Sequence, residues 1–177
     1  MKKIIAIATA AIFFVSCSKD KDLPDPTDTG EHKFGAKVNG EIWEARGFGP
    51  FPANDVLEAV RYGSSGDIVI KARNFASSPL EKEFYIFVKG ATATGTYPLN
   101  SNASHLSWDN SYAYYVVRNF TPQNEWITSV SHPGSVTFSK IDTVNRILAG
   151  TFQFEMLNWY NTPQPLSVTE GRFDIRY

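Results

Sequence analysis

The stretch GTFQFEM (residues 150–156) alternates apolar and polar side chains with a period of two. In a β-strand successive side chains point to opposite faces, so the pattern directs Phe152 and Phe154 toward a core and their neighbours toward solvent. The chain closes on FDIRY (residues 173–177), which alternates in the same way. We therefore expect these two segments to be paired strands with both phenylalanines pointing inward.

The same alternation recurs from His32 onward, while helical periodicity is weak. Residues 54–62 could form a short helix, but a strand is preferred there. Tyr85 and Phe87 are large and apolar where alternation asks for polar residues, which predicts a strand covered on both faces. The alternating segments are residues 34–38, 68–73, 84–89, 112–116 and 136–138.

Turn residues separate these segments, and Asn39-Gly40 between two of them is a strong signal for a two-residue hairpin. The sequence therefore predicts a single all-β domain over residues 32–177. Its expected architecture is an antiparallel sandwich or barrel of roughly ten strands.

The N-terminus has the pattern of a secretory signal, with two lysines followed by an uncharged apolar run over residues 4–15. That run is too short for a membrane span, which needs roughly 20 residues. Phe14-Val15-Ser16-Cys17 resembles the lipobox of bacterial lipoproteins, and Cys17 is the only cysteine of the chain. The resemblance implies a signal peptide over residues 1–16, cleavage after Ser16 and an acyl anchor on Cys17.

Residues 17–31 are expected to be the lipidated cysteine and a disordered tether, because SKDKDLPDPTDTG (residues 18–30) offers almost no apolar surface to bury. Removing the signal lowers the formal net charge from −1 by a further two charges, since Lys2 and Lys3 leave with it. A mildly acidic chain without a basic run argues against a nucleic-acid partner. The lipid would then be the contact with the membrane.

Residues 18–22 resemble the acidic, lysine-containing export tag that follows the cysteine in surface lipoproteins of Gram-negative bacteria with polysaccharide-utilisation systems. The tag implies an outer-membrane lipoprotein on the cell surface. The alternative is an ordinary solvated tether on the periplasmic face.

Four segments of the domain are also similar to a family of small lipoproteins of unknown function from the same bacteria. They are FGAKVNGEIWEA (residues 34–45), GTYPL (residues 95–99), residues 141–154 and TEGRFD (residues 169–174). The resemblance implies an all-β domain with surface or periplasmic residence, and it implies no activity.

The sequence offers no catalytic residues that stand out. It lacks a Gly-x-Ser-x-Gly elbow and a phosphate-binding Gly-rich loop, and His105 and His132 fit loop or surface positions. Paired carboxylates could meet only through the fold, and the glutamates that could supply them, Glu81, Glu83, Glu155 and Glu170, fit solvent-facing positions. We expect no enzyme, no metal site and no cofactor, and a hydrolase is the least favoured alternative.

Aromatic residues make up 14% of the chain, and tryptophans occur in three loop-like, asparagine-containing stretches. An indole beside amide and carboxylate groups suits a sugar, whose apolar face stacks while its hydroxyls form hydrogen bonds; exposed aromatic residues also mark protein interfaces. The alternative is that these rings plug the ends of the sandwich, as Trp43 is expected to fill its core. The candidate ligand-binding residues are Trp108, Asp109, Asn110, Trp126, Trp159 and Tyr160.

Two function classes follow from these patterns. One is a non-catalytic surface binding module for a glycan or a partner protein, and the other is a structural or assembly lipoprotein of the outer membrane without a small ligand. Separately, Asp142-Thr143-Val144 resembles the Asp-Thr-aliphatic acceptor of the O-glycosylation system in these bacteria, which implies a glycan on Thr143. An aspartate in a hairpin turn also has an ordinary structural reason.

Overall fold

The computed structural model describes residues 22–47, 56–76, 79–158 and 163–177, and in these the protein is all-β. Eleven antiparallel strands form one continuous sheet, and the predicted strand within residues 54–62 is present as β3. The strands are β1 (Lys33–Val38), β2 (Glu41–Glu44), β3 (Leu57–Arg61), β4 (Ile68–Asn74), β5 (Glu81–Val88), β6 (Gly95–Leu99), β7 (Tyr112–Asn119), β8 (Thr121–Ile127), β9 (Gly134–Asp142), β10 (Ile147–Asn158) and β11 (Pro165–Arg176).

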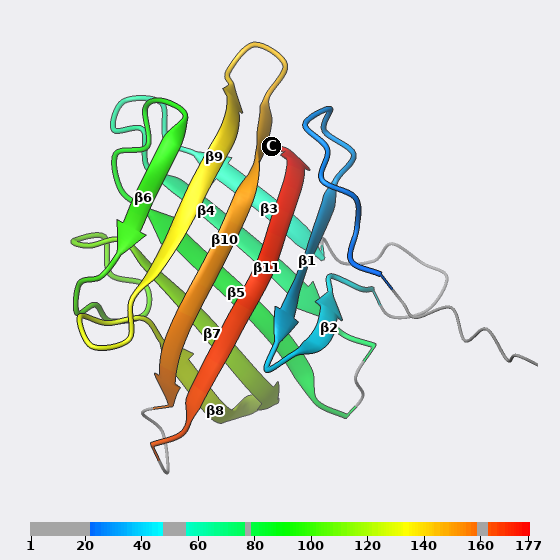
Figure 1. The fold of residues 1–177 in the computed structure, drawn as a ribbon, viewed down its shortest axis with the longest axis vertical. Coiled ribbons are helices and arrows are strands. Elements are labelled where there is room, and N and C mark those ends of the chain that lie inside the picture. Colours follow the sequence, from blue (N-terminus) through cyan, green and yellow to red (C-terminus); the bar gives the residue numbers. More distant parts are fainter. Residues whose placement is uncertain (1–21, 48–55, 77–78, 159–162) are drawn as a thin grey trace, which may run out of the picture.

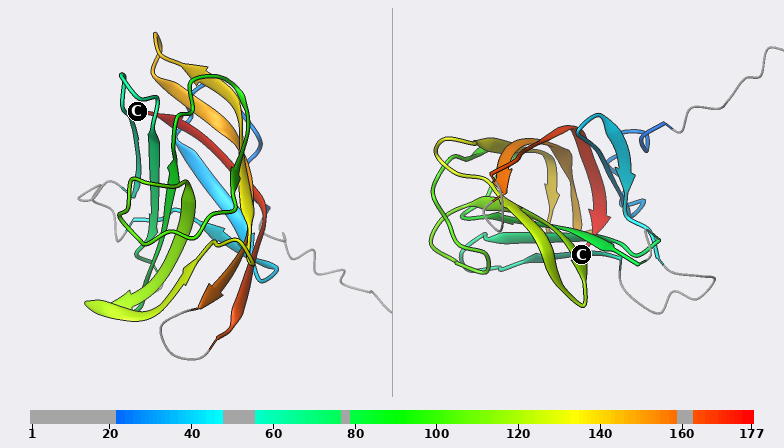
Figure 2. Two further views of the ribbon diagram at one scale, coloured as in Figure 1. Left: turned by 90° about the vertical axis from the view of Figure 1, so that its left-hand side faces the viewer. Right: turned by 90° about the horizontal axis from the view of Figure 1, so that it is seen from below.

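The sheet folds over on itself into two layers (Figures 1 and 2). One layer has the order β2-β1-β11-β10-β9-β6, and the other β8-β7-β5-β4-β3. Strand β10 belongs to both, because residues 147–154 pair with β9 while Leu157 and Asn158 pair with β8. An isolated bridge from Arg46 to Asn74 joins the layers near β2. Of the two predicted architectures, the described residues form the sandwich, with free edges at β2, β3 and β6.

The core between the layers follows the predicted alternation. Phe152 and Phe154 are buried, and β10 pairs with β11, so the predicted pairing and facing are confirmed. Trp43 is also buried in this cluster, as expected. The Asn39-Gly40 hairpin is present between β1 and β2, with both residues at positive φ (50° and 84°), as a type I′ turn requires.

Two glycines of the first layer give room to the core phenylalanines. A Cβ on Gly171 of β11 would lie 2.4 Å from the Phe152 ring, and one on Gly134 of β9 would lie 2.6 Å from the Phe154 ring. Each ring therefore lies over the bare backbone of a neighbouring strand, where a larger residue would push it away.

Strand β5 is covered on both faces, as Tyr85 and Phe87 predicted. Both outward rings are buried, and the strand register places them beside Tyr114 and Tyr112 of β7. These four rings belong to a second apolar cluster outside the sandwich core, and residues 100–111 between β6 and β7 contact it. The sheet is thus thickened on one outer face by a loop that carries a candidate site.

The disordered tether expected over residues 17–31 is wrong for its second half. The hydroxyl of Thr27 and the backbone N–H groups of residues 29–31 donate hydrogen bonds to the carboxylate of Asp174. The prediction considered only the apolar surface that this segment could bury, whereas polar contacts to one acidic side chain hold it. Residues 17–21 lie outside the described residues.

Candidate functional site

Residues 100–111 are fixed over the outer face of β5 and β7 by ring stacking and a backbone hydrogen bond. The His105 ring lies flat on Tyr114, with centroids 3.8 Å apart and an interplanar angle of 8°. The backbone N–H of Leu106 donates to the Tyr112 hydroxyl at 2.6 Å. Burial lowers the pKa of His105, so the stacked ring is neutral at pH 7. The loop therefore has a defined geometry.

Trp108 lies in this loop with its side chain half exposed. The Trp108 ring contacts Tyr62 and Phe87, each with ring centroids 5.1 Å apart and with interplanar angles of 85° and 71°. Trp108 is 47% exposed and Tyr62 41%. We call these two rings the Trp108 patch.

Polar groups surround the patch and stabilise its loop. The Ser107 hydroxyl donates to the Asp109 carboxylate at 3.2 Å, and the Lys89 ammonium donates to the Asp109 backbone carbonyl at 3.0 Å. The Asn110 amide donates to the carbonyl of Asn102 at 3.4 Å. The predicted Trp-Asp-Asn stretch is thus a single exposed loop that carries an indole, a carboxylate and an amide at consecutive positions.

Trp126 does not belong to this site, and its prediction as a ligand-binding residue is wrong. It is 9% exposed, lies between the layers against Tyr115, and donates its indole N–H to the Gln164 carbonyl at 3.1 Å. Strand β8 directs it inward, on the opposite face of the sheet from the Trp108 patch. The asparagines that made this stretch resemble a loop are partly structural, since the Asn158 amide donates to the Asn124 amide oxygen at 2.9 Å.

Three other predicted residues cannot be placed, because Cys17, Trp159 and Tyr160 lie outside the described residues. Thr143 is exposed in the turn between β9 and β10. The Asp142 carboxylate accepts the backbone N–H groups of Val144 and Asn145 there, at 2.9 and 2.8 Å. The structural role expected for an aspartate in this turn is therefore present.

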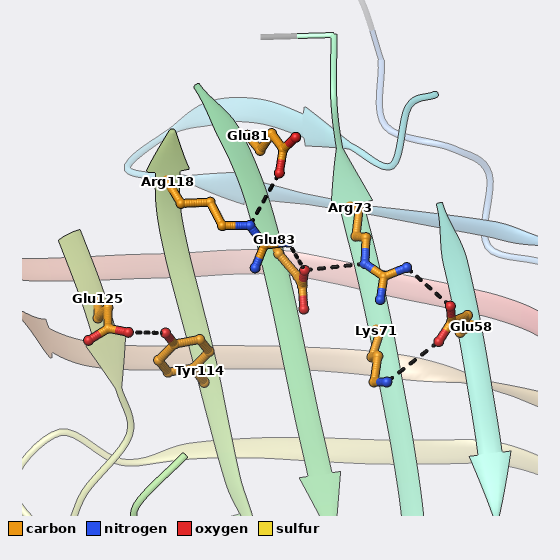
Figure 3. Close-up of polar contacts among 8 residues, drawn as sticks. All are labelled: Glu58, Lys71, Arg73, Glu81, Glu83, Tyr114, Arg118 and Glu125. Atoms are coloured by element: carbon orange, nitrogen blue, oxygen red, sulfur yellow. Dashed lines mark hydrogen bonds and ion pairs between the residues drawn. The ribbon is translucent and has the colours of Figure 1, made fainter. Parts of the chain in front are cut away.

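The outer face that bears the Trp108 patch continues into a network of ion pairs across four strands (Figure 3). Its centre is Glu83, a buried residue whose Oε2 accepts from Arg73 Nε at 3.2 Å and from Arg118 Nη2 at 2.6 Å. The network runs in order Lys71–Glu58–Arg73–Glu83–Arg118–Glu81. Glu83 was expected to face solvent, and it is instead the shared acceptor of two guanidinium groups.

The network has the geometry of cross-strand stabilisation. Each carboxylate of the network lies opposite a lysine or arginine of a neighbouring strand, and Glu83 bridges the guanidinium groups of two different strands. Next to the network, the Tyr114 hydroxyl donates to Glu125. Burial raises the pKa of Tyr114, and the bond to Glu125 raises it further, so the phenol remains a donor. We assign this end of the face a structural role.

One surface hollow is lined by residues 102–105 of the loop together with residues 127–129, and two others lie on the other layer. Two adjoining hollows of about 390 and 450 Å³ share Ser135 and Gln153 on the outer face of β9 and β10. Thr137 and Thr151 line the second of them. The second of these two hollows is the more polar one, and no tryptophan lines either of them. The Trp108 patch is thus not the wall of either hollow.

No family model, curated protein or solved structure matches the chain. The function is therefore argued from the fold and from the geometry of the site. In the part of the chain that the structure describes, no group of three or more His, Cys, Asp or Glu side chains is arranged to hold a metal ion. That part also contains no helix long and apolar enough to span a membrane.

Proposed function

We propose that this chain is a lipoprotein anchored in the outer membrane through Cys17, exposed on the cell surface, and that its β-sandwich is a non-catalytic binding module for a neutral glycan. The lipid anchor rests on the lipobox resemblance and the single cysteine. The binding role rests on the Trp108 patch, in which the exposed ring of one predicted ligand-binding residue, Trp108, lies against the exposed ring of Tyr62.

The observation that carries the binding proposal is the exposure of Trp108 in a fixed orientation. Two rings contact the indole, so little side-chain freedom is lost when a ligand covers its remaining exposed surface. An exposed indole next to an exposed tyrosine is costly to keep in water, and such patches commonly mark a binding surface. A flat aromatic surface of this kind suits the apolar face of a pyranose ring.

The neighbouring polar groups favour a glycan over a purely apolar ligand. Asp109 and Asn110 offer carboxylate and amide groups beside the indole, and Ser107 adds a hydroxyl. These are the groups that bind sugar hydroxyls through short hydrogen bonds. Stacking and neutral hydrogen bonds predict an affinity that changes little with salt.

A structural or assembly lipoprotein without a small ligand is the second candidate. The burial of Trp126 favours it, because one of the three expected binding tryptophans is a core residue. The two candidates differ in what the exposed Trp108 does, so the decisive experiment concerns that residue.

The test is Trp108→Ala in the soluble mature chain, with binding to a panel of soluble neutral polysaccharides measured by calorimetry. Loss of an aromatic anchor costs about 2 kcal/mol or more, which is roughly a 30-fold rise in Kd. The matched control is Phe120→Ala, since Phe120 is 99% exposed in the β7–β8 turn and makes no part of the patch. Tyr62→Ala should weaken binding less than Trp108→Ala does, because it removes a support and a smaller exposed surface.

The outcomes separate the candidates. Reduced binding by folded Trp108→Ala and unchanged binding by Phe120→Ala support the glycan module. Equal losses in both variants would place the site elsewhere. If the wild-type chain binds no polysaccharide of a broad panel, a protein partner or a structural role replaces the glycan proposal.

A further inference from the structure

Residues 24–31 lie against the outer side of β1 and β11, and we call this segment the strap. The carboxylate of Asp174 accepts most of the hydrogen bonds that hold it there. Asp174 Oδ2 accepts from Thr27 Oγ1 at 2.7 Å and from the backbone N–H groups of Thr29 and Glu31 at 3.1 Å. Its Oδ1 accepts from the Gly30 N–H at 2.7 Å. Four donors from one short segment thus converge on a single carboxylate.

Asp174 and the strap depend on each other. The residue alternates with the inward Phe173 and Ile175, so its side chain leaves the sheet on the outer face, yet it is only 2% exposed because the strap covers it. A carboxylate buried without donors is costly, and here the strap supplies them. Burial on its own raises the pKa of Asp174, but the hydrogen bonds from the strap outweigh this and hold the pKa below its usual value.

Two further hydrogen bonds and one close contact hold the strap against the sheet. Arg172 Nη1 donates to the Pro24 carbonyl at 3.1 Å, and Lys140 Nζ donates to the Asp28 carbonyl at 2.9 Å. Gly35 of β1 is needed here, since an added Cβ would lie 2.7 Å from the Pro24 ring. Side chains of β9 and β11 therefore hold the segment in place, and the missing side chain at Gly35 of β1 leaves room for the Pro24 ring.

We propose that residues 24–31 are a separable strap, docked onto the folded sandwich by Asp174, and that this docking sets how far the domain can move from its membrane anchor. The strap contributes no strand, and its hydrogen bonds and the contact of Pro24 with Gly35 lie on the outer face of the sheet, so its release should leave the core intact. The docking stands on its own, whereas its effect on reach rests on the proposed lipid anchor at Cys17.

The effect on reach follows from chain geometry. With the strap undocked, the 15 peptide units from Cys17 to His32 can span about 50 Å when fully extended. With Pro24 docked, only the seven units from Cys17 to Pro24 remain, or about 25 Å. The chain enters the domain beside β1, while the segment between β6 and β7 lies at the far side (Figures 1 and 2). Docking thus favours an orientation in which the Trp108 patch faces away from the anchor.

The docking should weaken in acid. A carboxyl whose folded pKa is depressed contributes stability above its unfolded value, near 3.9, and loses it as the pH falls through the folded value. Charged groups near Asp174 come from the strap (Asp25, Asp28 and Glu31), from β1 (Lys33), from β9 (Lys140) and from β11 (Arg172 and Arg176). The cations among them oppose protonation of Asp174, which places release well below neutral pH.

The first experiment is amide hydrogen exchange on the purified mature chain, which needs neither lipid nor glycan. In Asp174→Asn the amides of residues 29–31 should exchange at least about tenfold faster at pH 7, since hydrogen bonds to a charged acceptor are lost. The matched control is Asp28→Asn, because Asp28 takes part in the docking described above through its backbone carbonyl and not through its side chain. A strap-side double variant, Thr27→Val with Gly30→Ala, disturbs the same contact without changing any strand residue.

The results decide the docking proposal directly. A separable strap is supported if at least one of the two variants, Asp174→Asn or the strap-side variant, shows faster exchange in the strap while its β10 and β11 amides exchange as in the wild type. Unchanged strap exchange in both variants overturns it. Faster exchange throughout the sandwich in both variants overturns it as well, because the segment would then be an integral part of the core.

The second experiment tests reach. The lipidated chain carrying a donor dye on Ser64→Cys, an exposed turn position, is bound to vesicles of phosphatidylethanolamine and phosphatidylglycerol with an acceptor in the headgroups. Asp174→Asn should change energy transfer measurably and Asp28→Asn should not. Unchanged energy transfer in a chain whose strap is released refutes the effect on reach. Failure of the chain to associate with vesicles refutes the lipid anchor and does not bear on the docking of the strap.

Discussion

Gly171 leaves room for the Phe152 ring, and adding a methyl group there should reveal how tightly the sandwich is packed. An alanine Cβ would lie 2.4 Å from two ring carbons of Phe152 and 2.6 Å from a third. Real Cβ contacts do not reach such distances, so either the ring or β11 must move. Overpacking of this kind costs about 1–3 kcal/mol. We therefore expect Gly171→Ala to lower the free energy of unfolding by that amount.

Urea denaturation measures this change, with the fluorescence of the buried Trp43 and Trp126 as the probe. The control is Gly63→Ala, because no atom lies within 4 Å of a Cβ there and φ is not positive. That substitution should be neutral or stabilise the protein by about 0.4–1 kcal/mol, through the unfolded state.

A double-mutant cycle tests the assigned cause. If the Phe152 ring is what the new methyl group strikes, then Phe152→Leu should relieve part of the cost, and the two substitutions should be non-additive by at least about 0.5 kcal/mol. Strict additivity would show that the strain lies elsewhere in β11. A Gly171→Ala protein as stable as the wild type would refute the close packing of the two strands.

Four further predictions follow from the sites described above. Cys17→Ser should leave the domain folded but abolish fatty-acid labelling and membrane fractionation, and unchanged labelling would rule out the anchor. Phe154→Ala should cost about 3–5 kcal/mol in urea denaturation, since the ring is buried; a loss below about 1 kcal/mol would contradict its inward position. Strap protection measured by hydrogen exchange should persist near pH 7 and fall as the pH drops below about 4, because the pKa of Asp174 is depressed in the folded state. Thr143→Ala should remove a glycan from the intact mass of the native protein, and an unmodified wild-type mass would end that idea.

The alternation of residues 152–156 correctly predicted which side chains of β10 face the core. In this segment β10 lies between β9 and β11 of the same layer, so each side chain points either into the core or to the outer face. Strand β11 shows where alternation fails. Leu166 and Val168 point inward at even positions, whereas Phe173 and Ile175 point inward at odd ones. The change occurs at Glu170, which has a positive φ of 52° and lies at a shift of register against β10. Such a bulge adds one residue and reverses the facing of everything beyond it.

The candidate site was predictable only in part, because exposure depends on distant partners. The stretch around Trp108 combined turn residues with an indole, and it is an exposed loop. The stretch around Trp126 has a similar composition, but pairing of β8 with both β7 and β10 draws it into the sandwich. Asp174 was assigned to a solvated face from its position in the alternation, and no local signal shows that residues 27–31 return to cover it. Its burial is a property of segments more than 140 residues apart.

The pairing of β1 with β11 also constrains the order in which this chain can fold. Strand β1 pairs with β2 on one side, and on its other side it pairs with β11, whose residues lie more than a hundred positions later in the sequence. During synthesis or passage through an export channel, β1 and β2 can form a hairpin, but that hairpin has no layer to join until the C-terminal residues arrive. Contacts of such large sequence separation slow folding, because most of the chain must be ordered before they form. Loss of β11 would therefore separate the β1–β2 hairpin from its layer and leave the strap without Asp174.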